Sequence, residues 1–169
     1  MKKLFSISLM AVLLLTVFAC NAQSPKSPPA TVTQKVGDAT ISINYSQPSV
    51  KGRTIGKDLE PKDGVVWRTG ANDATVFEVD KDVMVEGKAL PAGKYALFTL
   101  VNGDDWRIIF NKTWKQWGAF KYKDADDALR VNVKAGKADP FAEKMEFTIS
   151  EKGTVTLLWG DNKVEFGVK

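Results

Sequence analysis

Apolar and polar residues alternate along most of the chain after residue 30, and turns that carry glycine separate the alternating segments. A period of two places successive side chains on opposite faces of an extended strand, which buries one face and leaves the other in water. About nine or ten such strands joined by short turns, with no long amphipathic helix, are typical of all-β folds. The pattern therefore predicts a mainly β, antiparallel domain, as a β-sandwich, a jelly-roll-like fold or a partly closed barrel. The predicted inward-facing residues are Ile41, Ile43, Tyr45, Thr75, Phe77, Val79, Val83, Val85, Tyr95, Leu97, Thr99, Trp106, Ile108, Phe110, Val131, Val133, Met145, Phe147, Ile149, Val155, Leu157, Trp159, Val164, Phe166 and Val168.

Turn residues fix some of the connections between these strands. Gly37 is predicted to turn the chain between a strand at 32–36 and the strand that follows it. Gly87 is predicted to close a tight hairpin, because glycine readily takes the positive φ that such turns require. The segment 95–100 is apolar on both faces, which indicates a strand in the centre of a sheet.

One long segment, residues 111–129, breaks the alternation and is predicted to be an irregular or short-helical loop. It carries four aromatic residues, Trp114, Trp117, Phe120 and Tyr122. Two interpretations stay open for them. Exposed aromatic rings at the end of a β domain can stack on sugar rings, and inward-facing rings would close the open end of the fold as core.

The N-terminus has the features of a secretory signal peptide. Lys2 and Lys3 precede an apolar run that includes residues 9–15 and ends just before Cys20. A permanent transmembrane helix needs about 20 apolar residues, so this run does not predict a membrane span. Cys20 resembles the cysteine of a bacterial lipoprotein, which cleavage turns into an acylated N-terminus. Cleavage before Gln23, with export in soluble form, is the alternative.

These features divide the chain into a signal peptide at 1–19, a disordered tether rich in proline and serine at 20–30, and one domain at 31–169. A single cysteine cannot form an internal disulfide, so the core must hold the domain together. We expect an exported, lipid-anchored protein of the cell envelope. The absence of an acidic run after Cys20 favours the periplasmic side of the outer membrane.

Composition and charge exclude several classes of function. The formal net charge of +4 falls by two when Lys2 and Lys3 leave with the signal peptide, and the basic residues are mixed with acidic ones, which gives no case for nucleic acid. The chain has no histidine, which excludes Ser-His-Asp and Cys-His nucleophiles and histidine-based zinc sites. Residues 124–127 carry three aspartates but lack the glycine and closing glutamate of a calcium loop. Neither a metal nor a cofactor is predicted.

The segment VVWRTGAND, residues 65–73, contains the principal candidate for binding chemistry. On a period-two strand Arg68 faces away from Trp67, so burial of Trp67 would direct Arg68 towards the mouth of the fold. Gly70 permits a turn there. Asn72 is predicted to hydrogen-bond the exposed backbone amides of that turn.

Two roles stay open for Arg68. Its planar guanidinium could clasp loop carbonyls or a carboxylate and hold the turn, a role that lysine could not copy. The same group, with Tyr45 and Asn111 nearby, could instead recognise the carboxylate or phosphate of a ligand. Arg53, which follows a bend at Gly52, raises the same choice, and a partly exposed ion pair there would contribute at most about 1 kcal/mol.

Six short segments occur in a distinctive order: INYSQPSVKGR (43–53), VVWRTGAND (65–73), ALPAGKYALFTL (89–100), WRIIFNK (106–112), QWGAF (116–120) and LRVNV (129–133). Together they resemble the family known as domain of unknown function 2911, and the resemblance covers essentially the whole mature domain. The resemblance implies a compact, mostly β domain in the envelope of Bacteroidota-type bacteria. It implies no activity and carries over no catalytic residue.

Three classes of function remain. The favoured one is a non-enzymatic envelope module that binds a partner protein or a small, anionic or glycan-like ligand. The alternatives are a structural component of the envelope without a ligand, and a glycan hydrolase that acts through two carboxylates. The candidate ligand-binding residues are Arg68, Asn72, Tyr45, Asn111, Trp114 and Trp117.

Overall fold

A computed structural model describes residues 26–169. The predicted signal peptide, Cys20 and the first part of the predicted tether lie outside these residues. The strands are β1 (Pro29–Val36), β2 (Ala39–Ser46), β3 (Val66–Trp67), β4 (Val76–Val79), β5 (Val83–Val85), β6 (Lys88–Leu90), β7 (Gly93–Asn102), β8 (Asp105–Asn111), β9 (Asp127–Ile149) and β10 (Thr154–Gly167), and a single 3-10 turn, η1 (Asp124–Asp126), precedes β9. In this described part of the chain, no helix is long and apolar enough to cross a membrane.

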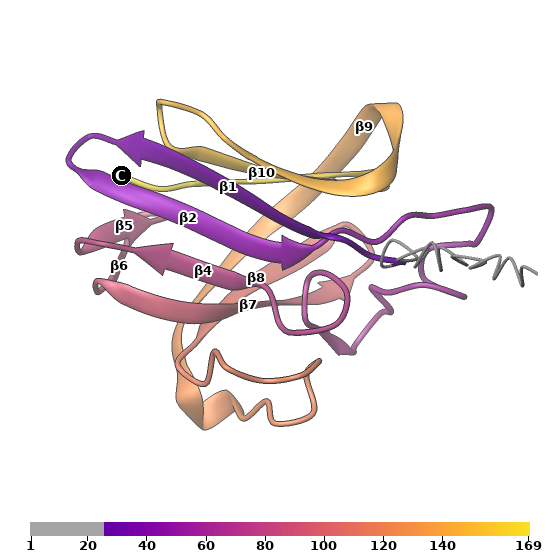
Figure 1. Ribbon diagram of the computed structural model, residues 1–169, viewed down its shortest axis with the longest axis horizontal. Coiled ribbons are helices and arrows are strands. Elements are labelled where there is room, and N and C mark those ends of the chain that lie inside the picture. Colours follow the sequence, from indigo (N-terminus) through magenta and orange to yellow (C-terminus); the bar gives the residue numbers. More distant parts are fainter. Residues whose placement is uncertain (1–25) are drawn as a thin grey trace, which may run out of the picture.

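The strands form one antiparallel sheet in the order β1-β2-β4-β7-β8-β9-β10, to which β3 adds beside β7, and β5 and β6 pair separately. The sheet curls into a half-barrel. In Figure 1 the long strand β9 climbs from the bottom of the molecule to the top, and β10 returns across the upper part of the view. This architecture confirms the predicted mainly β class with a sandwich-like or partly closed arrangement. The predicted hairpin turns at Gly37 and Gly87 are also present, and both glycines have positive φ.

The sequence pattern divided the last third of the fold into too many strands. The predicted strands around 131–133 and 145–149 belong to the single strand β9, and those around 155–159 and 164–168 belong to β10. The pairing of β9 with β10 shifts register on both sides of Gly160, whose φ of +62° is in the left-handed region. Such irregularities bend a strand without ending it, so the hydrogen-bonded ladder continues around the corner of the half-barrel.

The core fills the inside of the curl. Phe77 of β4, Phe110 of β8 and Phe166 of β10 pack on one another, with ring centres 5.0 Å apart for Phe77 and Phe110 and 6.0 Å apart for Phe110 and Phe166. Tyr45 of β2 meets Phe147 of β9 edge to face at 5.1 Å. These contacts join strands from the two sides of the curled sheet, which is how the fold holds together with no disulfide in the described part of the chain.

A second, smaller cluster covers the outer face of β7. Ala96 and Phe98 point away from the main core and pack with Ile109. The segment 112–123 folds over them, and the ring of Tyr122 lies 5.1 Å from that of Phe98. Because both faces of β7 are covered, the prediction of a central strand is confirmed.

Within the described residues, regular structure starts before residue 31, the predicted start of the domain. Strand β1 starts at Pro29, and the backbone amide of Gln47 donates a 2.8 Å hydrogen bond to the carbonyl of Pro28. Proline is tolerated here because β1 is an edge strand and needs no amide on its free side. Both core clusters consist of residues between Ala30 and Val168, so the chain from Lys26 onwards carries a core of its own, large enough for independent stability.

The β9–β10 turn offers a test of this packing. A Cβ added at Gly153, where φ is +83°, would overlap the carbonyl oxygen of Val168, whereas a Cβ at Gly37, where φ is +57°, meets nothing within 4 Å. We expect Gly37→Ala to lower the free energy of unfolding by about 1–2 kcal/mol through its φ alone. Gly153→Ala should lower it by a further ~1–3 kcal/mol through overpacking. Urea denaturation of residues 26–169 measures both, and equal losses would contradict the close approach of Val168.

Candidate functional site

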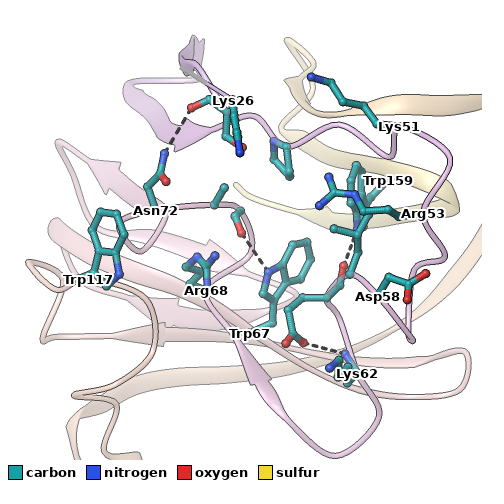
Figure 2. Close-up of a pocket in the computed structure, with 16 residues that line it drawn as sticks. Lys26, Lys51, Arg53, Asp58, Lys62, Trp67, Arg68, Asn72, Trp117 and Trp159 are labelled. Atoms are coloured by element: carbon teal, nitrogen blue, oxygen red, sulfur yellow. Dashed lines mark hydrogen bonds between the residues drawn. The ribbon is translucent and has the colours of Figure 1, made fainter. Parts of the chain in front are cut away.

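A pocket of about 670 Å³ lies where β2 and β3 end (Figure 2). We call it the Arg68 pocket. Its walls come from the start of the described chain, the segment 48–62, the turn 67–72, the loop that carries Trp117, and β10. The lining residues are Lys26, Ser27, Pro48, Lys51, Arg53, Asp58, Leu59, Glu60, Lys62, Trp67, Arg68, Gly70, Ala71, Asn72, Trp117 and Trp159.

The turn 67–72 is fixed by its own hydrogen bonds. Trp67 is buried, and its indole Nε1 donates to the carbonyl of Gly70 at 3.1 Å. The hydroxyl of Thr75 donates to the carbonyl of Thr69 at 2.7 Å, and the amide of Thr75 donates to the carbonyl of Arg68 at 3.1 Å. These bonds hold Thr69 at a φ of +51°, which is unusual for a β-branched residue.

Gly70 has a different role from the one that the sequence indicated. It does not provide the left-handed conformation of the turn, because the residues with positive φ there are Thr69 and Asn72. A Cβ at Gly70 would instead lie 2.9 Å from the hydroxyl of Thr75 and 3.2 Å from the carbonyl oxygen of Ser46. Glycine therefore allows the turn to pack directly on the end of β2.

Asn72 joins three parts of the pocket wall. Its side-chain amide donates to the carbonyl of Ser27 at 3.3 Å and to the hydroxyl of Ser46 at 3.2 Å. Its backbone carbonyl accepts a 3.0 Å hydrogen bond from the amide of Gly118, next to Trp117. The side chain thus acts as a donor to neighbouring segments, and not as the predicted acceptor for amides of its own turn.

Arg68 is half-buried in the Arg68 pocket, where Figure 2 shows it between Trp67 and Trp117. Its Nε is buried and has no hydrogen-bond partner among residues 26–169. Burial lowers the pKa of the guanidinium from its ordinary value, and the charge of Glu60 opposes that shift. Trp67 and Thr75 hold the turn, and the Nε of Arg68 makes no hydrogen bond that would clasp it.

The role of a carbonyl clasp belongs to Arg53. Its Nε donates to the carbonyl of Val50 at 3.1 Å and its Nη2 donates to the carbonyl of Ser49 at 2.8 Å. On the same wall, the indole Nε1 of Trp159 donates to the carbonyl of Glu60 at 2.7 Å. The segment 48–62 is therefore held in place by side chains other than Arg68.

The Arg68 pocket has an excess of positive charge, with five basic residues and two acidic ones in its lining. Both carboxylates are engaged by backbone amides. Asp58 accepts from the amide of Thr54 at 3.0 Å, and Glu60 accepts from the amide of Lys62 at 3.1 Å. A concave site with this balance concentrates anions.

Three of the six candidate ligand-binding residues, Arg68, Asn72 and Trp117, line the pocket together, and the other three lie elsewhere. Tyr45 is in the core, where its hydroxyl accepts from the amide of Phe147 at 3.2 Å. Asn111 is fully buried. Its side-chain amide donates to the carbonyl of Lys123 at 2.9 Å and to Asp127 at 2.7 Å. These bonds hold the end of the segment 112–123 against β8.

Trp114 stands apart from the pocket, and Lys94 Nζ lies 5.5 Å from the centre of its ring. Of the four aromatic residues of this loop, Tyr122 packs inward on the second cluster, as the core interpretation expected. The other three, Trp114, Trp117 and Phe120, are exposed, as the stacking interpretation requires.

Sequence reasoning missed most of the cationic wall. Lys26, Lys51 and Lys62 come from segments with no periodicity, and their meeting depends on how the chain returns to the end of β2. Trp159 was assigned to the core, and it is both buried and part of the lining. No group of three or more possible metal ligands occurs within residues 26–169.

The two arginines should differ in what they contribute to stability. We expect Arg53→Met to lower the free energy of unfolding by about 1–3 kcal/mol, because two carbonyls lose a charged donor. Arg68→Met should leave stability unchanged or raise it, because it removes a partly desolvated charge whose Nε is unpaired. Chemical denaturation of the two variants side by side is the measurement. If Arg68→Met is as costly as Arg53→Met, Arg68 holds the turn after all.

A model of one protein family, described as a protein of unknown function (DUF2911), matches residues 27–168. No curated protein and no solved structure gives a match. The matched span contains every strand of the half-barrel and all of the pocket lining except Lys26. Because the match covers far more than half of the chain, the protein belongs to the DUF2911 family, as its six ordered segments predicted.

Proposed function

We propose that the protein is a non-enzymatic binding module that holds a small anionic ligand in the Arg68 pocket. The observation that carries the proposal is the buried, unpartnered Nε of Arg68. A buried donor without a partner costs about 1–3 kcal/mol, and more when it belongs to a charged group. A carboxylate or phosphate placed against the guanidinium would satisfy it with strong, charge-assisted hydrogen bonds.

The strained backbone beside Arg68 supports a role in binding. Thr69 has a left-handed conformation that costs about 1–3 kcal/mol, and such residues cluster at ligand clamps and active sites. Hydrogen bonds of Trp67 and Thr75 within the domain hold this conformation. The site is therefore preorganised, which reduces the entropy lost on binding.

The size and lining of the pocket favour an acidic sugar or sugar phosphate. A volume of about 670 Å³ is within the range of ~300–1,000 Å³ that is usual for small-molecule sites. Trp117 is 60% exposed at the rim and offers a flat apolar face on which a sugar ring can stack. Lys26, Lys51 and Lys62 supply further positive charge around Arg68.

The place of action that we propose is the cell envelope. The basic residues and apolar run before Cys20 are typical of a secretory signal, and Cys20 is placed as in a lipoprotein. The resemblance to exported proteins of Bacteroidota-type bacteria supports the same location. A lipid anchor at Cys20 on the periplasmic side of the outer membrane would keep the binding domain at the membrane surface.

Binding can be tested with three probes, glucuronate, glucose 6-phosphate and inorganic phosphate, with glucose as the neutral control. We expect at least one anionic probe to bind to residues 26–169, and Arg68→Met to weaken that binding at least about tenfold through loss of a charged hydrogen bond. Isothermal titration calorimetry measures the affinities. Arg107→Met is the matched control, because Arg107 is exposed, lies outside the pocket lining, and donates from its Nε to the side chain of Asn132 at 3.1 Å. A response to Arg107→Met equal to that of Arg68→Met, or no binding of any probe, would favour the structural alternative.

The lipid anchor has its own test. We expect Cys20→Ser to release the full-length protein from salt-washed membranes, where ionic contacts are screened, and to abolish incorporation of labelled palmitate. Cell fractionation and metabolic labelling are the measurements. Retention of the label by Cys20→Ser would refute lipidation at this residue.

A further inference from the structure

We infer that the loop 112–123 docks the domain on an anionic membrane surface, with the Arg68 pocket beside the contact. We call this segment the aromatic-lysine loop. The docking surface is an inference separate from the pocket ligand. If the loop docks in this way, the pocket would bind its ligand at the membrane surface, and this consequence rests on the proposed function.

The aromatic-lysine loop presents an unusual concentration of exposed aromatic rings. Phe120 is 85% exposed, Trp117 60% and Trp114 37%. Half of the exposed large hydrophobic side chains of residues 26–169 are therefore on this one short segment, and the others, Val65, Met84 and Phe141, are isolated in sequence from it. Tryptophan and phenylalanine on a polar background favour the boundary between lipid headgroups and acyl chains.

Lysines alternate with these rings. The loop carries four lysines, all of them exposed: Lys112, Lys115, Lys121 and Lys123. Three aspartates, at 124, 126 and 127, follow these four lysines. One of them, Asp126, accepts a 3.0 Å hydrogen bond from the hydroxyl of Thr113. Each lysine near an anionic bilayer contributes about 1 kcal/mol to attraction. The aromatic rings would contact the apolar boundary of an anionic bilayer, and the lysines would attract its charged headgroups.

The aromatic-lysine loop is held in shape before any contact is made. The side chain of Gln116 is buried, and its Oε1 accepts from the amide of Lys121 at 3.2 Å. Tyr122 packs on Phe98 and donates to Asp127 at 2.9 Å, while burial and that carboxylate raise the pKa of Tyr122 to about 12. The exposed rings are therefore presented by a fixed scaffold, so docking would need little ordering of the backbone.

The start of the described chain lies on the same side as Trp117. Lys26, Ser27 and Trp117 all line the Arg68 pocket, and Asn72 bonds both Ser27 and Gly118. Figure 1 shows β1 beginning at the end of the molecule where the loops after β2 gather. Only residues 21–25 separate Cys20 from Lys26, and a chain of that length reaches at most about 20 Å. An anchor at Cys20 would thus hold this side of the domain close to the bilayer.

The experiment compares two triple variants of residues 26–169, which lack the anchor. The loop variant is Phe120→Ser with Lys115→Gln and Lys121→Gln, none of which lines the Arg68 pocket. The matched control is Phe141→Ser with Lys137→Gln and Lys144→Gln, which removes the same charge and another exposed phenylalanine from β9. Sedimentation with vesicles of phosphatidylcholine alone, or mixed equally with phosphatidylglycerol, measures binding. Thermal unfolding of both variants confirms that they fold.

We expect the parent domain and the control variant to bind the anionic vesicles and not the phosphatidylcholine vesicles. The loop variant should lose at least about tenfold in partitioning, since it lacks two lysines and the most exposed ring. Equal binding by the two triple variants, or no preference for anionic lipid, would overturn the inference.

Arg68→Met separates this inference from the proposed function. It should weaken binding of the soluble anionic probes and keep vesicle binding, whereas the loop variant should keep probe binding and weaken vesicle binding. Loss of vesicle binding in Arg68→Met would overturn docking through the aromatic-lysine loop, because contact would then be made by the pocket. Vesicle binding without binding of any soluble probe would refute only the proposed function.

Discussion

The hydrogen bond from the Trp67 indole to the carbonyl of Gly70 is the constraint on which the candidate site depends. Burial of Trp67 in the core fixes the end of β3, and the indole then closes the turn that follows it. Arg68 follows the last residue of β3, and its side chain lines the Arg68 pocket beside that of Trp67. Because Thr75 supplies two further bonds of the turn, the fold places Arg68 at a concave surface without a hydrogen bond from its Nε.

The two arginines near the pocket differ in what they contribute to the fold. Arg53 bonds two carbonyls and keeps the segment 48–62 in place, with help from Trp159. Arg68 is partly desolvated, and its Nε contributes no bond to the described chain. Local departures from the rules of stability are expected at functional positions, where a group is kept for a ligand at some cost to the folded state.

The sequence predicted those features that depend on local chemistry. Alternation identified the strands, glycine marked the hairpin turns, and apolar residues on both faces placed β7 in the centre of the sheet. The continuity of β9 and β10 was missed, because bulges interrupt the period of two without ending the ladder. The roles of Arg53 and Arg68 could not be assigned, since a period of two gives the side to which a residue points and not its partner. The basic residues of the pocket wall, Lys26, Lys51 and Lys62, come from separate parts of the chain, so no local sequence pattern predicts that they meet.

Asn72 connects the features that would have to work together at a membrane. Its side chain holds Ser27 at the start of the described chain, its backbone carbonyl holds Gly118 in the aromatic-lysine loop, and its own position follows from the turn that presents Arg68. Its left-handed φ of +59° is compatible with asparagine and unfavourable for most residues. Asn72 therefore links the start of the described chain, the Arg68 pocket and the aromatic-lysine loop. A domain held at its N-terminus would present the pocket and the loop to the same surface.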